Sequence, residues 1–97
     1  MTLEDIQLVL INVLREVQEL CGRKWEGLAT TGKPIGDLNG FDSLCSIEAT
    51  AIVEQRLGGT PLGPSSLFIS EEGTRALTLQ EISNRVYALR KALQGES

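Results

Sequence analysis

Apolar side chains near the start of the chain recur every three or four residues, which is the period of a helix with one buried face. They are Leu3, Ile6, Val9, Leu10, Val13, Leu14, Val17 and Leu20. Thr2 followed by Asp5 approximates a capping box, and Gly22 accepts the left-handed backbone at which helices often end. The pattern therefore predicts a first helix over residues 3–20.

The following segment, residues 21–42, has no sustained period and contains five glycines. Such a composition is typical of a long ordered loop, and long loops in small domains often carry function. Its apolar side chains are expected to hold parts of the loop against the core, with the lone tryptophan as an anchor. They are Trp25, Leu28, Ile35, Leu38 and Phe41.

Residues 43–57 contain neither proline nor glycine and precede a Gly-Gly pair, which predicts a second helix. At helical spacing one broad apolar face is formed by Cys45, Ala49, Ile52, Val53 and Leu57. A second, narrower stripe is formed by Leu44, Ile47 and Ala51, and it is bordered by Glu48, Glu54 and Gln55. We expect this stripe either to lie partly under a loop or to meet a partner.

The rest of the chain predicts one short and one long helix. In residues 58–77 we expect a loop in which Ser70 caps a short third helix with an acidic first turn. Thr78 with Glu81 forms a capping box for a fourth helix over residues 78–94. No segment alternates like a strand, so the predicted fold is all-α, a four-helix bundle in one domain over residues 1–97.

Charge excludes one class of partner and permits another. Nine Lys and Arg stand against 13 Asp and Glu, a net charge of -4, and no basic cluster is present to bind phosphates in a row. Nucleic acid is therefore not expected as a partner, whereas basic patches of other proteins are. The acidic start of the chain and the lack of an apolar run near the roughly 18 residues of a membrane span predict a cytoplasmic protein off the membrane.

The residue types present also exclude much catalytic chemistry. The chain has no histidine, which removes histidine-dependent triads, histidine metal sites and imidazole acid–base catalysis. Cys21 and Cys45 are too few for a structural zinc site, and we expect reduced thiols because the predicted compartment is reducing. The prediction is a non-enzyme with no metal.

One segment carries a recognisable motif. Residues 35–44 end in Asp42-Ser43-Leu44, directly before a helix with Glu48 and Glu54. The segment resembles the acyl carrier protein family, in which an aspartate-serine-leucine motif opens the second helix. The resemblance implies that Ser43 is esterified to 4′-phosphopantetheine, with Asp42 and Leu44 completing the motif. It also implies a partner-recognition face made of Ile47, Glu48, Ala51 and Glu54.

The position of Ser43 agrees with such a role but does not require it. A serine at a helix start lies near unpaired backbone N–H groups and the positive end of the helix dipole, which favour a phosphate ester. Serine and aspartate are also common helix caps, so Ser43 could be a cap alone. Cys45, Gln55 and Arg56 stand where typical members have acids, and the loops before Ser43 and at residues 58–68 are longer, which indicates a specialised member.

The resemblance leads to a functional expectation with two alternatives. The chain would carry acyl intermediates as thioesters in fatty-acid or specialised lipid or polyketide biosynthesis. Its partners would be a phosphopantetheinyl transferase, an acyl-loading ligase or transferase and ketosynthase-type enzymes, and we expect a monomer. An apolar groove lined by Ile52, Val53, Leu57 and Phe68 could shelter the acyl chain. The alternatives are an aminoacyl or peptidyl carrier of secondary metabolism and a non-carrier helical interaction module.

Overall fold

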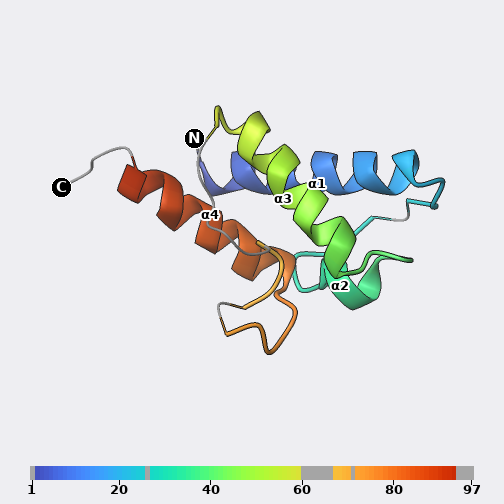
Figure 1. Ribbon diagram of the computed structural model, residues 1–97. Coiled ribbons are helices and arrows are strands. Elements are labelled where there is room, and N and C mark those ends of the chain that lie inside the picture. Colours follow the sequence, from blue (N-terminus) through green and yellow to red (C-terminus); the bar gives the residue numbers. More distant parts are fainter. Residues whose placement is uncertain (1, 26, 60–66, 71, 94–97) are drawn as a thin grey trace.

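The described part of the chain is mostly helical. The computed structural model describes residues 2–25, 27–59, 67–70 and 72–93. Its helices are α1 (Leu3–Leu20), α2 (Pro34–Asp37), α3 (Ser43–Arg56) and α4 (Leu79–Leu93) (Figure 1). Within these ranges the only extended pairing is an isolated bridge between Ile69 and Ala76. The all-α class is therefore confirmed, and the finer acyl-carrier arrangement stays a prediction.

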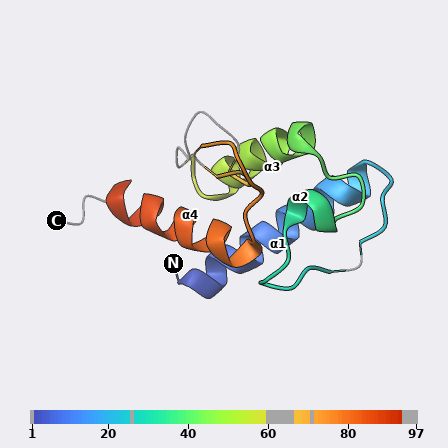
Figure 2. The same ribbon diagram turned by 90° about the horizontal axis from the view of Figure 1, so that it is seen from below.

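The first helix, α1, is the centre of the packing and contacts both α3 and α4. Gln7 of α1 donates to Gln80 of α4, whereas Glu16, nearer the end of α1, pairs with Arg56 of α3 at 2.6 Å. Figure 2 shows α3 and α4 reaching different parts of α1. The packed side chains that are almost fully enclosed include Ile6, Leu10, Val13, Leu14, Val53, Leu67, Phe68, Leu79, Ile82 and Val86.

The capping box predicted for α1 is present. The Thr2 hydroxyl accepts from the backbone N–H of Asp5 at 3.1 Å, and the Asp5 carboxylate accepts from the backbone N–H of Thr2 at 3.0 Å. These bonds satisfy N–H groups that a helix start leaves without partners. At the other end the apolar pattern and the burial diverge, because Leu20 is exposed and the polar Gln18 is enclosed.

The start of α4 is fixed by the loop that follows α1. The carbonyl oxygens of Gly32 and Thr30 accept from the backbone N–H groups of Leu79 and Gln80 at 2.8 and 2.9 Å. Thr78 and Glu81 form the predicted capping box. The backbone N–H of Thr78 donates to the Glu81 carboxylate at 2.9 Å, and the backbone N–H of Glu81 donates to the Thr78 hydroxyl at 3.1 Å. The unpaired donors of this helix end are thus used to hold the loop in place.

The short third helix predicted after Ser70 is wrong for the residues described. From Leu67 to Leu77 the described chain turns back on itself: the N–H of Leu77 donates to the carbonyl of Phe68 at 2.9 Å, and that of Ser70 to Arg75 at 2.9 Å. Gly73, with φ of 73°, allows the tight reversal. The Ser70 hydroxyl accepts from the N–H groups of Thr74 and Arg75, so it caps a turn instead of a helix. Residues 60–66 and 71 of the predicted loop lie outside the described residues.

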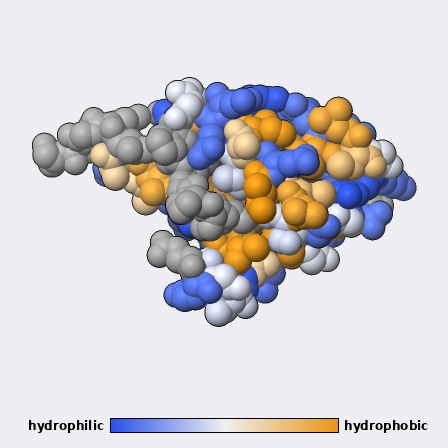
Figure 3. All heavy atoms as spheres, in the orientation of Figure 1, coloured by the Kyte–Doolittle hydropathy of each residue, from blue (hydrophilic) through white to orange (hydrophobic). Residues whose placement is uncertain are grey.

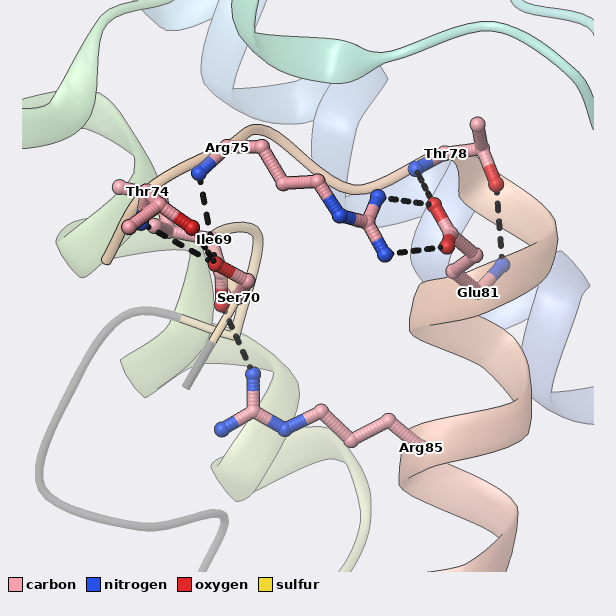
Figure 4. A network of polar contacts seen from close by, with 7 residues as sticks. All are labelled: Ile69, Ser70, Thr74, Arg75, Thr78, Glu81 and Arg85. Carbon is pink, nitrogen blue, oxygen red and sulfur yellow. Dashed lines mark hydrogen bonds and ion pairs between the residues drawn. The ribbon is translucent and has the colours of Figure 1, made fainter. Parts of the chain in front are cut away.

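This turn is tied to α4 by two arginines (Figure 4). Arg75 places both terminal nitrogens on the Glu81 carboxylate, at 3.1 and 2.8 Å, and Arg85 donates to the carbonyl of Ile69 at 3.0 Å. Glu81 therefore serves two purposes, since it also accepts from the backbone of Thr78. The guanidinium of Arg75, followed by the Thr78 N–H, lowers the pKa of Glu81 from 4.5 to about 2.

This pKa predicts a pH dependence of stability. Because the folded pKa is the lower one, the contribution of ionised Glu81 is complete above about pH 4.5 and is lost as the pH falls toward about 2. We expect Glu81→Gln to lower the thermal unfolding midpoint at pH 7, and the gap from wild type to close as the pH approaches 2. Thermal unfolding monitored by circular dichroism checks this. A gap that stays constant across that range would contradict it, and Glu48→Gln on an exposed turn of α3 is the control.

The buried face of α3 is rotated from the one that apolar periodicity predicts. Ala49, Val53 and Leu57 are buried as expected, but Cys45 and Ile52 are only half-buried. The polar residues Ser46 and Thr50 occupy the core side instead. The hydroxyl groups of both residues are hydrogen-bonded to backbone carbonyl oxygens of α3.

The Thr50 hydroxyl joins α3 to the segment after it. It donates to the carbonyl of Ser46 at 2.7 Å and accepts from the backbone N–H of Leu67 at 3.0 Å. A buried hydroxyl with both partners costs little, whereas an unsatisfied N–H at Leu67 would be unfavourable. The face of α3 that is buried is therefore determined by the hydrogen bond to Leu67 as well as by hydrophobicity.

Candidate functional site

Ser43 is the first residue of α3 and is exposed to solvent. Its carbonyl oxygen accepts from the hydroxyl of Ser46 at 2.6 Å. Among the described residues no hydrogen bond occupies the Ser43 hydroxyl itself. The Ser43 hydroxyl oxygen is therefore accessible to another molecule. The helical turn that carries it is held by hydrogen bonds to its backbone.

Asp42, and not Ser43, is the cap of α3. Its backbone is extended, and one carboxylate oxygen accepts from the backbone N–H of Cys45 at 3.0 Å. That N–H, followed by the Cys45 thiol, holds the pKa of Asp42 below its ordinary value. Capping by Asp42 leaves the neighbouring hydroxyl of Ser43 out of the helix-start network.

Buried side chains anchor the chain that approaches Ser43. Leu38 and Phe41 are both part of the core, and the ring of Phe41 packs edge-on against Phe68 with centroids 5.6 Å apart. The sequence predicted these anchors but not the single turn of α2 just before them. Asp37 stabilises this turn by accepting from the backbone N–H of Lys33 at 2.7 Å. The loop that leads into Ser43 is thus held by buried side chains and by a hydrogen-bonded turn.

A polar cluster that the sequence did not predict lies beside this loop. Arg23 donates to the Gln18 side chain at 3.3 Å and to the Cys45 sulfur at 3.4 Å. The contact with Cys45 is the main cause of a raised Arg23 pKa. Cys45 was expected on the broad apolar face of the helix, and it is half-buried with a cation against its sulfur. No local pattern could reveal this, because Arg23 and Cys45 are 22 positions apart.

The narrow apolar stripe of α3 is exposed and not covered by a loop. Leu44 is 73% exposed and Ile47 is 57% exposed, and both Ala51 and Glu48 are exposed as well. Glu54, the last residue of the predicted recognition face, is half-buried. Figure 3 shows apolar side chains among polar ones on the face that carries α3. Four of the five residues therefore present an accessible surface next to Ser43, mixed in polarity.

The predicted acyl groove falls on residues that belong to the core. Val53, Leu57 and Phe68 are buried, and Ile52 is half-buried at their margin. Trp25, expected as an anchor, is also half-buried and packs against this core. These side chains are apolar enough to surround an acyl chain, and three of the four belong to the packed core. A groove among them stays a prediction.

The described residues contain no group of three or more His, Cys, Asp or Glu side chains placed to hold a metal ion. Cys21 and Cys45 are both free thiols. None of the helices described is long and apolar enough to cross a membrane.

Comparison of the chain with protein-family models, with curated proteins and with solved structures found no match.

Proposed function

We propose that this chain is a carrier protein of the acyl-carrier type, modified with 4′-phosphopantetheine on Ser43. The observation that supports the proposal is the exposed Ser43 hydroxyl, free of described hydrogen bonds, in an Asp-Ser-Leu motif at the start of a helix. An ordinary capping serine would use its hydroxyl on the helix backbone. Here Asp42 performs that task, which leaves the Ser43 hydroxyl available for modification.

The residues present fit an attached phosphopantetheine. An exposed hydroxyl can be reached by a transferase, and the first turn of α3 places backbone dipoles where a phosphate diester is favoured. When attached, the group supplies a terminal thiol that carries acyl groups as thioesters. The bond from the Ser43 oxygen to phosphorus forms as the diphosphate bond of coenzyme A breaks, and adenosine 3′,5′-bisphosphate leaves.

The proton of the Ser43 hydroxyl has to be removed by the transferase. Asp42 is the nearest acid in sequence, but its carboxylate is engaged by the N–H of Cys45, and its lowered pKa makes it a weak base. The chain therefore brings the nucleophilic oxygen and leaves the base to its partner. This division is consistent with a carrier that performs no catalysis itself.

Partner enzymes would bind the exposed stripe of α3. Leu44 and Ile47 offer apolar contact, and Glu48 offers negative charge to a basic patch. The small side chain of Ala51, one turn further along α3, lets a partner approach the helix closely. We propose that transferase, acyl-loading ligase or transferase, and ketosynthase-type enzymes use this face in turn, within fatty-acid or specialised lipid or polyketide biosynthesis.

The carrier proposal is tested by intact-mass measurement. The purified chain is incubated with coenzyme A, Mg²⁺ and, in parallel reactions, phosphopantetheinyl transferases of broad and of narrow carrier specificity. We expect the mass to rise by a single phosphopantetheine. A chain that stays unmodified with every transferase would contradict the proposal.

Charge reversal tests the recognition face. We expect Glu48→Lys to lower kcat/KM for transfer about three- to tenfold, mainly through slower association, because one attractive contact becomes repulsive. The effect should shrink as salt is raised, since exposed charges are screened. Glu72→Lys, on the exposed turn before α4, is the matched control. Equal rates for the two variants would remove this face from the proposal.

The exposed stripe also favours a second candidate, a helical interaction module without a prosthetic group. Leu44 and Ile47 could pack against an apolar helix of another protein even if Ser43 were never modified. The mass measurement separates the two candidates, because only the carrier gains a covalent group.

A further inference from the structure

Arg23 connects the end of α1 to the start of α3. Its backbone N–H donates to the carbonyl of Gln18 at 2.8 Å, which turns the chain just after α1. Its guanidinium then reaches both the Gln18 side chain, at 3.3 Å, and the sulfur of Cys45, at 3.4 Å. One half-buried cation therefore bridges two helices that are separated by the long loop.

Gln18 extends this connection to the chain before Ser43. Its side chain is fully enclosed, and its amide nitrogen donates to the carbonyl of Asn39 at 2.8 Å. The Gln18 amide oxygen accepts from Arg23. An enclosed amide that lost these partners would be unfavourable, so the arrangement is specific. Asn39 lies four residues before Ser43 and Cys45 two residues after it, so both flanks of the serine are held by the same pair.

Gly40 lets Arg23 approach this loop closely. A Cβ atom added at Gly40 would lie 2.6 Å from the Arg23 Nε, and 3.0 Å from Cδ and Cζ. The guanidinium thus occupies the space that any other residue at this position would fill. Gly40 also has φ of 70°, a conformation that glycine accepts readily.

We propose that Arg23 is a positioning residue for Ser43, which fixes residues 39–45 against the end of α1. The inference rests on the proposed function for the role of Ser43. The contacts that Arg23 makes with Gln18, Gly40 and Cys45, here named the Arg23 clamp, are present in the unmodified chain. Arg23 acts through Gly40 and Cys45 and has no described contact with the serine. Its loss would leave Ser43 accessible but spread over more orientations, which lowers the rate of a reaction that needs one geometry.

Two different substitutions remove the clamp. Arg23→Met keeps a long side chain and deletes the hydrogen bonds, whereas Gly40→Ala keeps the arginine and displaces it. Gly58→Ala is the matched control for the second, because Gly58 has a similar φ of 74°, open space around its Cα, and a place at the opposite end of α3. Arg23→Lys keeps the charge without the planar fork of donors.

Hydrogen exchange and transfer kinetics read out the clamp independently. The amides of Phe41, Cys45 and Ser46 are hydrogen-bonded in the loop and first turn. We expect Arg23→Met and Gly40→Ala each to speed their exchange at least about tenfold by local opening. We expect kcat for phosphopantetheine transfer to fall about tenfold while KM stays within about twofold, since the recognition face is unchanged.

The two substitutions should also be non-additive. If both act by removing one contact, the double variant resembles each single variant, whereas independent effects would multiply. Arg23→Lys is expected to recover part of the rate, and Gly58→Ala to leave the exchange of the three amides as in wild type.

The outcomes separate this inference from the proposed function. Unchanged exchange of Phe41, Cys45 and Ser46 in Arg23→Met overturns the positioning role, whether or not the chain is modified. Faster exchange with an equal rise in KM and no change in kcat also overturns it. A wild-type chain that no transferase modifies overturns the carrier function, and the exchange measurement then still decides whether Arg23 holds the loop.

Discussion

Replacing Ser43 by alanine is expected to abolish the addition of phosphopantetheine completely. The hydroxyl oxygen is the atom that would bond to phosphorus, and alanine offers none. The variant should fold, because Ser43 is exposed, Asp42 provides the cap of α3, and alanine is favourable inside the first turn of a helix. Intact mass after incubation with coenzyme A and transferase is the measurement, and circular dichroism confirms the fold.

The chain offers a matched control for this result. Thr31→Ala removes an exposed hydroxyl from the loop before α2 and should leave the modification complete. A Ser43→Ala chain that still gains one phosphopantetheine would show that another residue is the attachment site. Modification of the wild type at Thr31 would contradict the assignment equally, and peptide mapping distinguishes these cases.

Phe68→Ala is expected to cause the largest loss of stability, about 3–5 kcal/mol in the free energy of unfolding. Phe68 is fully buried, packs edge-on against Phe41, and belongs to the segment that Thr50 ties to α3. Alanine would remove most of the buried aromatic area and leave a cavity. A loss of this size is a large fraction of the 5–15 kcal/mol typical of small domains. Urea unfolding followed by tryptophan fluorescence and circular dichroism measures it.

Two further variants show whether burial is the cause. Phe68→Leu keeps much of the apolar volume and should cost clearly less. Tyr87→Ala removes an aromatic ring of similar size from a position on α4 that is 41% exposed, and it should cost clearly less stability than Phe68→Ala because less apolar area is buried there. An equal loss for Phe68→Ala and Tyr87→Ala would mean that Phe68 does not belong to the core. Because Phe41 supports the Ser43 loop, Phe68→Ala should also slow modification.

Local patterns were sufficient for the three longer helices. The boundaries of α1 and α4 follow from Thr2 with Asp5 and from Thr78 with Glu81, pairs whose side chains satisfy the backbone only a turn away. The capping contacts join residues three or four positions apart, so a single sequence contains them. The exposure of Ser43 agrees with its place at a helix start, whereas the sequence left open whether the Leu44 stripe lies under a loop, and the structure shows it exposed.

The same reasoning failed where the backbone of a short segment can form its hydrogen bonds in more than one conformation. Ser70 before acidic residues is typical of a helix start, but its hydroxyl caps a reversed turn at Gly73, since Arg75 and Arg85 tie that turn to α4. The four residues of α2 include Ile35 and Gly36 with non-helical backbone angles, so no helical period could show there. Isolated short helices are marginal in stability, and at Ser70 the contacts with α4 decide the conformation.

Sequence alone thus determined which stretches are helical, where the longer helices begin, and which serine stands at the start of α3, because periodicity and capping act over a few residues. Tertiary structure decided that Gln18 and Thr50 are enclosed, that α3 turns its polar Ser46 inward, and that Arg23 lies on Gly40 beside Cys45. The physical reason is that a buried polar group is acceptable only when a partner far along the chain meets it, and no local pattern records that meeting.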